Sequence, residues 1–599
     1  MSERVPDRPD IVVVMTDEER AVPPYEARDV RAWRDRVLNG RKWFDDHGVS
    51  FVRHYTGSLA CVPSRPTIFT GHYPDVHGVT QTDGIGKTAD DSRMRWLRPG
   101  EVPTLGNWFR AAGYDTHYDG KWHISHADLA DPGTGRPLAT NDDAGVVDPA
   151  AVRRYLDTDP LGPYGFSGWV GPEPHGALLA NAGVRRDSLI ADRVVAWLTD
   201  RYARRRAGDE AARRPFLLVA SFVNPHDIVL FPAWSRGGPV RPSPLDPPPV
   251  PAAPTADEDL SSKPAAQIAF REAYYSGYGP AAVVSRIYRS NAQRYRDLYY
   301  RLHAEVDGPI DRVRRAVTEH GSDDAVLVRT SDHGELLGAH GGLHQKWFNL
   351  YDEATRVPFV IARIGPDATV PRVVTAPTSH IDLLPTLLGA AGVDVGAVAG
   401  KLAESFSEVH ELPGRNLMPV VDGGATDDGR AVYLMTRDNM LEGDTGASGA
   451  ARRFKWSANP PAPLRIRVPA HVGSNFEGLV TRVDGCLWKL VRTFDDPATW
   501  TEPGVRHLAA NGLGGEAYRT SPVEDQWELY DLTNDPIEAV NRWADPALDE
   551  LRARLRMRLK EERARAVPER NRPWPYVPHR PPASESAGLV SRVKAAFGR

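Results

Sequence analysis

The stretch Asp10-Ile11-Val12-Val13-Val14-Met15, followed by Thr16-Asp17-Glu18-Glu19, decides the fold. Its unbroken run of apolar, mostly β-branched residues is typical of a parallel strand that is buried on both faces. Acidic side chains stand at the point where the strand ends. Because ligands of open α/β sheets bind beyond the carboxyl ends of the strands, we expect Asp17 and Glu18 to face a site.

Three further runs end in polar residues in the same way. They are 215–222 before Asn224-Pro225-His226-Asp227, 325–330 before Ser331-Asp332-His333-Gly334-Glu335, and 114–118 before Asp119-Gly120-Lys121-Trp122-His123. A solvated turn explains any one of them, but the four together predict one shared site. Helical patterns lie between the strands, at 295–317 with a kink or break at Gly308-Pro309, and at 381–391. This alternation predicts an α/β fold with a large, mostly parallel or mixed sheet covered by helices on both faces.

The pattern changes after about residue 425. Residues 479–483 and 486–491 flank Asp484-Gly485 and predict a β-hairpin, 527–532 predicts a strand, and 551–565 a charged helix. We therefore predict a catalytic domain over 1–425, a smaller α+β subdomain with an antiparallel sheet over 426–566, and a proline-rich tail over 567–599. An apolar stripe over 589–597 predicts a short amphipathic helix. The sequence leaves open whether it packs on its own chain, joins subunits into a homo-oligomer or lies on a membrane.

Composition limits the functional class. The 599 residues are 41% hydrophobic and 26% charged, which is typical of a soluble globular protein with a large core. The formal net charge of −5 argues against a nucleic-acid partner. The two cysteines, Cys61 and Cys486, cannot form a disulfide framework, and we expect Cys486 to pack within the hairpin. No signal-like segment or apolar run long enough to span a bilayer is evident, so we expect a cytoplasmic protein.

The segment Cys61-Val62-Pro63-Ser64-Arg65 carries the most specific signal. With its continuation Pro66-Thr67-Ile68-Phe69-Thr70-Gly71, it resembles the maturation sequence of the type I sulfatases, which belong to the alkaline phosphatase-like superfamily. In that family the cysteine is oxidised to formylglycine, whose hydrate is the nucleophile. The segment also resembles a helix start, with Ser64 as the cap and free amide groups near residue 61.

Other segments resemble the same family. They include 106–114, Gly120-Lys121-Trp122-His123, Phe222-Val223-Asn224-Pro225-His226, 342–348, 352–358, 380–388 and 528–536, so the resemblance spans nearly the whole chain. It implies that Asp17, Glu18, Asp332, His333 and the oxidised Cys61 hold one divalent cation. Carboxylate ligands favour Ca²⁺, and the imidazole leaves Mg²⁺ or Mn²⁺ open. Glu18 departs from the family, where aspartate is commoner, and we expect it to bind less directly.

The resemblance also implies the catalytic roles. Arg65, Lys121 and Lys346 bind the sulfate and the modified residue, His123 is a base, and His226 meets the ester oxygen as a general acid. Lys121, His226 and Lys346 thus contact the substrate. The implied reaction is hydrolysis of a small sulfate ester, with a formylglycine-generating enzyme as the partner for maturation.

Three alternatives remain. The first is a phosphonate monoester or phosphodiester hydrolase, which shares this nucleophile and site. The second is a catalytically silent protein that binds a sulfated ligand, if Cys61 is not oxidised. The third is a metal-dependent phosphomutase, which would need a serine or threonine nucleophile. The sequence does not name the alcohol, which the loops near 80–100, 124–180 and 228–290 are expected to select. The proline-rich segment 231–254 is expected to be an extended surface loop.

Overall fold

The computed structural model describes residues 8–573, except 84–88, 90–93, 175–177, 276–277, 279, 320, 322–323, 438–471, 498–505, 509–516 and 520. The predicted tail helix at 589–597 lies outside the described residues. The two predicted boundaries, between residues 425 and 426 and between residues 566 and 567, stay predictions.

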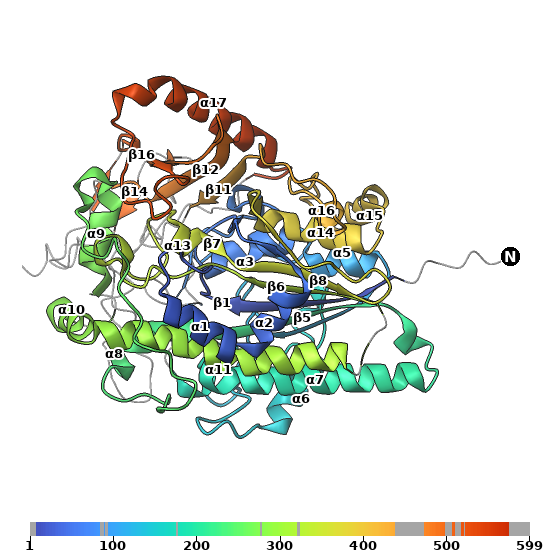
Figure 1. Ribbon diagram of the computed structural model, residues 1–599. Helices are drawn as coiled ribbons and strands as arrows, with labels where there is room; N and C mark the ends of the chain where they lie inside the picture. Colours follow the sequence, from blue (N-terminus) through green and yellow to red (C-terminus); the bar gives the residue numbers. More distant parts are fainter. Residues whose placement is uncertain are drawn as a thin grey trace, which may run out of the picture.

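A seven-stranded sheet forms the centre of the described structure (Figure 1). β1, β5, β6 and β4 run parallel, as the four apolar runs predict. β8 is antiparallel to β6 and β2, so the sheet is mixed. In order across the sheet the strands are β4 (Asp115–Gly120), β5 (Phe216–Pro225), β1 (Asp10–Asp17), β6 (Ala325–Ser331), β8 (Phe359–Ile364), β2 (Val49–Phe51) and β9 (Arg372–Val374).

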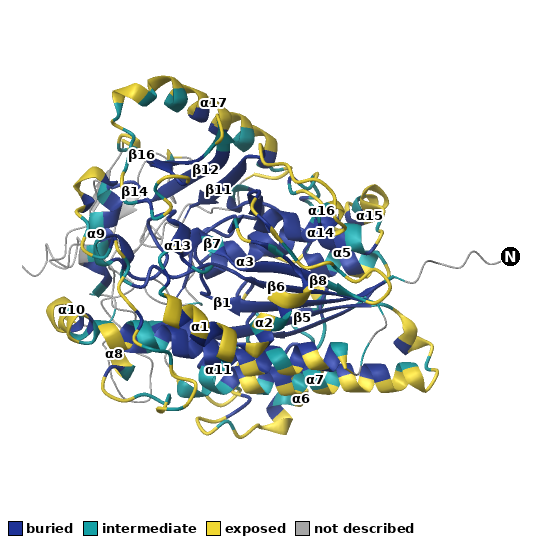
Figure 2. Cartoon of the chain, viewed as in Figure 1, coloured by how far each residue is buried: buried dark blue, intermediate teal, exposed yellow. Residues whose placement is uncertain are grey.

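Helices cover both faces of this sheet, and the alternation along β1 shows why. Val12 and Val14 belong to a core shared with α7 and α11, whereas Ile11, Val13 and Met15 belong to a second core shared with α3, α5 and α14. Both sets are fully buried, and the helices expose only their outer faces (Figure 2). The helices are α1 (Arg28–Val37), α2 (Asn39–His47), α3 (Cys61–Thr70), α4 (Pro74–His77), α5 (Leu105–Ala111), α6 (Pro149–Thr158), α7 (Gly183–Arg206), α8 (Phe231–Trp234), α9 (Ala265–Tyr274), α10 (Ala281–Ser290), α11 (Ala292–Thr318), α12 (Ala339–Gly342), α13 (Asp352–Thr355), α14 (Leu383–Ala390), α15 (Val395–Leu402), α16 (Met418–Val421) and α17 (Asp549–Ala566).

Of the kink or break predicted at Gly308-Pro309, the break into two helices is wrong. α11 runs from Ala292 to Thr318 with Pro309 inside it. Proline removes one backbone donor, but the apolar stripe of α11, including Val306, Ile310 and Val313, is buried against the sheet and α7. That burial holds the two halves in one helix.

A four-stranded antiparallel sheet packs beside the start of α4 and beside α13, and carries α17 on its outside (Figure 1). The predicted hairpin is confirmed and is longer than expected. The strands in order are β11 (Val432–Thr436), β12 (Asn475–Val483), β13 (Cys486–Phe494) and β16 (Gln526–Asp531). Smaller sheets consist of β10 (Thr378–Ser379), β3 (His54–Tyr55) and β7 (Arg356–Val357), and of β14 (Arg506–Leu508) with β15 (Ala517–Arg519).

This second sheet touches the segment that leads into Cys61. Met435 N donates to Gly57 O at 3.0 Å, and Thr436 Oγ1 donates to Leu59 O at 2.7 Å. The C-terminal residues therefore help to fix the position from which α3 begins.

The proline-rich segment 231–254 starts with α8 and then lies against α1 and α11. Trp33 Nε1 donates to Leu245 O at 3.2 Å, and Val250 N donates to Asp297 at 2.8 Å.

Among the described residues no single helix is long and apolar enough to span a membrane. Two helical segments joined at a bend, His380–Ala390 and Val395–Leu402, are together long and apolar enough by length and composition.

Candidate active site

The four parallel strands deliver the predicted site residues to one edge of the sheet. In the register of these strands Asp17 lies opposite Pro225 and Thr16 opposite Ser331, so the residues after β1, β5 and β6 are neighbours. Lys121 follows β4 directly, and its backbone N–H donates to Ser221 O on β5 at 2.9 Å. Segments far apart in the sequence thus meet at the carboxyl ends of the strands, as parallel sheets favour.

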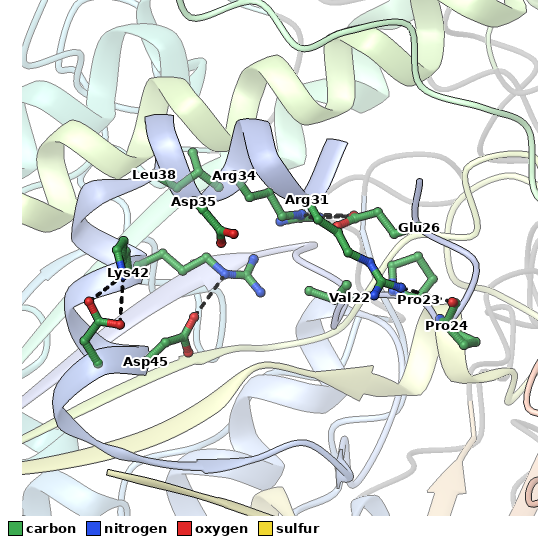
Figure 3. Close-up of a pocket in the computed structure, with 12 residues that line it drawn as sticks. Val22, Pro23, Pro24, Glu26, Arg31, Arg34, Asp35, Leu38, Lys42 and Asp45 are labelled. Carbon is green, nitrogen blue, oxygen red and sulfur yellow. Dashed lines mark hydrogen bonds and ion pairs between the residues drawn. The ribbon is translucent and has the colours of Figure 1, made fainter. Parts of the chain in front are cut away.

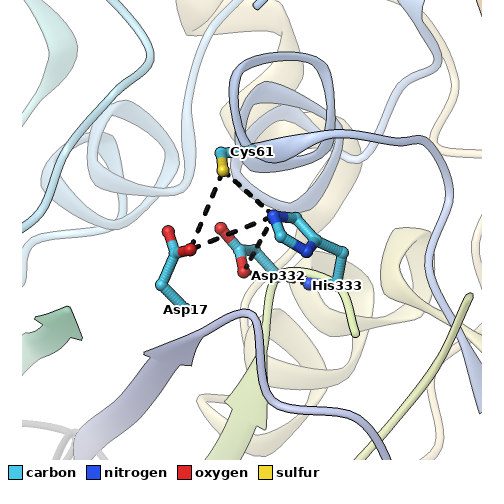
Figure 4. Close-up of side chains that lie close together, drawn as sticks. All are labelled: Asp17, Cys61, Asp332 and His333. Carbon is cyan, nitrogen blue, oxygen red and sulfur yellow. Dashed lines mark hydrogen bonds and ion pairs between the residues drawn. The ribbon is translucent and has the colours of Figure 1, made fainter. Parts of the chain in front are cut away.

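Asp17, Cys61, Asp332 and His333 form a compact, fully buried cluster (Figure 4). One ligand atom from each lies within 4.8 Å of the others. Cys61 Sγ lies 3.0 Å from His333 Nε2 and 3.7 Å from Asp17 Oδ1. Two carboxylate oxygens, an imidazole nitrogen and the residue at position 61 thus surround one point, which is a donor set suited to a divalent cation.

The hydrogen bonds of His333 fit ligation. Its Nδ1 lies 3.0 Å from Gly334 O and donates to that carbonyl, which leaves the lone pair of Nε2 toward the cluster. Burial, and then the nearby ammonium of Lys346, hold the pKa of His333 well below its usual value. The imidazole is therefore neutral, as a metal ligand must be.

The two aspartates respond differently to burial. Burial alone would raise the pKa of Asp17, but Lys121, His226 and Arg65 outweigh it and hold that pKa well below its usual value. Burial, and then the adjacent Asp17 carboxylate, raise the pKa of Asp332 to about 7. Two carboxylates this close repel each other, so a cation between them relieves the repulsion.

α3 begins at the candidate nucleophile. The N-cap is Ala60, so Cys61 is the first helical residue and its thiol lies at the positive end of the helix dipole. The prediction that Ser64 caps the helix is wrong. The helix starts four residues earlier, with Ala60 and not Ser64 as the N-cap, and Ser64 Oγ instead donates to Asp332 O at 2.6 Å. Burial, and then the Asp17 carboxylate, raise the pKa of the Cys61 thiol, so the unmodified side chain is a poor nucleophile.

Arg65 ties the elements of the site together. It is fully buried, and its Nη2 donates to Asp17 Oδ2 at 2.7 Å while Nε donates to Asp332 Oδ2 at 2.8 Å. Its Nη1 donates to Lys121 O at 2.7 Å and to Ser221 Oγ at 3.1 Å. One planar guanidinium therefore orients both aspartates and the chain at Lys121.

Both predicted lysines point into the same buried region. Lys121 Nζ lies 2.7 Å from Asp17 Oδ2, and Lys346 Nζ lies 3.0 Å from Glu18 Oε2. Three cationic side chains and the carboxylates of three acidic residues thus meet where water is excluded. Such an arrangement is expensive to bury and is suited to holding an anion together with a metal ion.

Glu18 and His226 lie beside the Cys61 cluster. Glu18 Oε2 is 4.0 Å from His226 Nε2, and both residues can share a cation with Asp17. The cluster around Cys61 does not include Glu18. His123 is also buried, and its Nε2 lies 2.6 Å from Asp83 Oδ1. The roles assigned to these side chains stay predictions.

Two further buried residues at the site were not predicted from the sequence. Glu335 Oε1 accepts hydrogen bonds from Tyr295 OH, Leu337 N and Gln345 N at 2.8 to 2.9 Å, and so shapes the loop that ends at Lys346. Gln345 Oε1 lies 3.2 Å from Lys346 Nζ. Glu335 lies in 331–335 and Gln345 lies in 342–348, two segments that also contain predicted site residues. No periodicity or spacing distinguishes either residue from its neighbours in the sequence.

A surface cavity of about 380 Å³ between α1 and α2 lies apart from this chemistry (Figure 3). Its charged side chains are largely paired with one another, as in Arg34 with Glu26 and Lys42 with Asp46. None of Cys61, Asp332 and His333 lines it. We therefore do not assign catalysis to it.

Comparison with known proteins agrees with the geometry. The Sulfatase family profile matches residues 9–393. The chain is 28% identical to the sulfatase YidJ of Escherichia coli over 426 residues, 69% of this chain and 71% of that protein. It is 26% identical to the choline-sulfatase of Rhizobium meliloti, over 69% of this chain and 72% of that protein.

Solved structures share the fold. A 2-O GAG sulfatase superposes with a TM-score of 0.55 at 19% identity, covering 93% of this chain and 92% of its own. A phosphonate monoester hydrolase from Silicibacter pomeroyi superposes with a TM-score of 0.53 at 20% identity, covering 94% and 96%. Since the family profile covers well over half of its length, this chain belongs to the sulfatase family and is a sulfuric ester hydrolase.

Proposed function

We propose that this sulfatase hydrolyses a small sulfate monoester to an alcohol and inorganic sulfate, with oxidised Cys61 as the nucleophile and one divalent cation at its side. The observation that carries the proposal is the position of Cys61 Sγ among Asp17, Asp332 and His333, at the start of a helix. A thiol that only packed in a core would not be surrounded by two carboxylates and an imidazole.

The residues present fit the cation. Asp17, Asp332, His333 and position 61 would hold it, with Glu18 at the margin, and the carboxylate oxygens favour Ca²⁺ over softer ions. When bound, such an ion polarises the sulfuryl group and neutralises negative charge. The aldehyde hydrate that forms at residue 61 after maturation supplies one hydroxyl to attack sulfur, which breaks the bond from sulfur to the ester oxygen. Deprotonation of the second hydroxyl then restores the aldehyde as the carbon–oxygen bond to the sulfate breaks and inorganic sulfate leaves.

The side chains around residue 61 supply the rest of the chemistry. Lys121, Lys346 and Arg65 hold the sulfuryl oxygens and offset charge that develops on them. His226 protonates the leaving alkoxide, and His123 removes the proton from the second hydroxyl. A maturation enzyme that oxidises Cys61 is the partner that this mechanism requires.

Replacement of Cys61 tests the proposal. Cys61→Ala should reduce turnover of nitrophenyl sulfate by at least about a thousandfold while the fold is kept. Cys486→Ala is the matched control, because that cysteine lies in the β12–β13 hairpin. Full activity of Cys61→Ala, or of protein produced without a maturation enzyme, would rule the mechanism out.

The mass of the peptide around Cys61 separates an enzyme from a silent binder. Maturation removes one H₂S and adds one oxygen, and an unchanged thiol in active protein would contradict the proposal.

The structural similarity to phosphonate monoester hydrolases favours a second candidate activity. Relative kcat/KM on nitrophenyl sulfate and on a phosphonate monoester decides between the two, and a screen of aryl, alkyl, choline and sugar sulfates identifies the alcohol.

A further inference from the structure

Gln345 stands directly before Lys346 and shares its environment. The side chain is fully buried, and its Oε1 lies 3.2 Å from Lys346 Nζ. An ammonium group offers only donors, so the carboxamide must turn its oxygen toward Lys346 and its nitrogen elsewhere. The orientation of the Gln345 side chain is therefore fixed by the charge beside it.

The amide nitrogen of this side chain finds no acceptor among the described residues. Gln345 Nε2 is buried and makes no hydrogen bond to any described residue. Leaving a buried donor unpaired is unfavourable, and native proteins rarely do so without a reason. The backbone adds to the cost, because Gln345 has a φ of 66°, in the left-handed region that residues other than glycine seldom adopt.

The surroundings hold Gln345 in this conformation. Its N–H donates to Glu335 Oε1 at 2.9 Å, and its carbonyl accepts from Leu336 N at 3.0 Å. Both backbone groups are thus satisfied, while Nε2 remains unpaired among the described residues. Strain and an unpaired donor on the residue next to a sulfate-binding lysine point to a ligand atom as the missing partner.

Among the described residues, Lys346 also has a donor to spare at the same place. Its contacts with Glu18 Oε2 and Gln345 Oε1 use two of the three ammonium hydrogens. Nε2 of Gln345 is joined through a single carbon to the oxygen that faces this ammonium, so both donors are within reach of one small oxyanion.

We propose that Gln345 is a substrate-binding residue whose Nε2 donates a hydrogen bond to a sulfuryl oxygen held by Lys346. This inference rests on the proposed function, since it assigns a second ligand to the same anion. It makes Gln345 and Lys346 a pair of donors, one neutral and one charged, and it accounts for the unpaired amide and the strained backbone together.

The test compares Gln345→Leu and Gln345→Glu with the matched control Gln267→Leu. Gln267 is also a buried glutamine, but its Nε2 donates to Glu528 and its Oε1 accepts from Tyr351, so both ends are satisfied within the protein. For each variant the measurements are the inhibition constant of inorganic sulfate, KM and kcat on nitrophenyl sulfate, and the melting temperature with and without sulfate.

Loss of one hydrogen bond to an anion should weaken sulfate binding about tenfold in Gln345→Leu. Gln345→Glu should weaken it further, because a carboxylate replaces the donor and repels the anion. The rise in melting temperature that sulfate produces should shrink in both variants. Gln267→Leu should lower the melting temperature yet leave the inhibition constant of sulfate within twofold of wild type.

The outcomes are distinguishable. Wild-type inhibition constants in both Gln345 variants, with an active wild-type enzyme, would overturn this inference and leave the proposed function standing. A wild-type protein with oxidised Cys61 that neither binds sulfate nor hydrolyses any sulfate ester would overturn both. If Gln345→Leu does not fold, the isosteric Gln345→Glu decides the question.

Discussion

Arg65 Nε lies 2.8 Å from Oδ2 of Asp332, although α3 and the loop after β6 are far apart in the sequence. The same guanidinium also reaches Asp17, so one side chain fixes how the two carboxylates that follow the paired strands β1 and β6 are oriented toward each other. The geometry of the candidate metal site therefore depends on a residue that is not itself a ligand.

Arg65→Lys should reduce kcat/KM by about a hundredfold or more even though the charge is kept. A lysine cannot make the parallel contacts to two carboxylates that a planar guanidinium makes. Arg430→Lys is a matched control, because Arg430 binds Asp382 with two contacts of 2.6 Å, between residues that are not in the Cys61 cluster. It should lower stability and leave kcat/KM nearly unchanged. Equal losses of activity in the two variants would refute a specific role for Arg65.

Removal of the divalent cation should abolish activity and lower the melting temperature by roughly 5 °C or more, since a ligand that binds only the folded state stabilises it. Calcium should restore both. Asp332→Asn removes one ligand, and its melting temperature should respond little to a chelator. Unchanged activity and melting temperature of the wild type after exhaustive chelation would show that no such ion is needed.

Lys489→Met should destabilise the folded protein by about 3–5 kcal/mol, because it leaves buried carboxylates without their cation. Lys489 Nζ, on β13, lies 2.6 Å from Asp352 and 2.8 Å from Glu538, and it also donates to Leu350 O at 2.9 Å. Denaturant unfolding measures the loss. Arg554→Met, which removes a surface ion pair with Asp484, is the control and should unfold like the wild type. Similar unfolding curves for both variants would contradict the assignment.

His340 should make stability fall at alkaline pH. Burial disfavours its charged form, but the carboxylates of Glu353 and Glu258 outweigh burial and raise the pKa of His340 to about 9. A raised folded-state pKa gives stability that is complete below about pH 6.5 and is lost as the pH rises through 9. The loss is at most about 3 kcal/mol.

The comparison variant for this prediction is His340→Gln, which cannot titrate. Its unfolding free energy should be lower than that of the wild type at pH 6 and should change less between pH 6.5 and 9. Identical pH profiles of stability for the two proteins would show that the ion pairs of His340 do not contribute.

Several features followed from local sequence alone. The runs at 10–15, 215–222 and 325–330 are buried parallel strands in the structure. A continuous run of apolar, mostly β-branched residues is typical of a parallel strand that helices cover on both faces. The hairpin around Asp484-Gly485 formed as predicted, since that dipeptide favours its turn. Where local patterns misled, longer-range contacts decided: Ser64 donates to Asp332 instead of capping α3, and α11 continues through Pro309.

The sequence by itself thus determined the four parallel strands, the family and the residue types at the strand ends, because these depend on periodicity and on short motifs. Only the tertiary structure decided which atoms meet. Three such features are Arg65 lying between Asp17 and Asp332, Lys489 joining the second sheet to the segment after Lys346, and Nε2 of Gln345, which has no acceptor among the described residues. All three depend on side chains brought together across long stretches of chain. Such contacts have no local signature, because packing of the whole core fixes the distances between them.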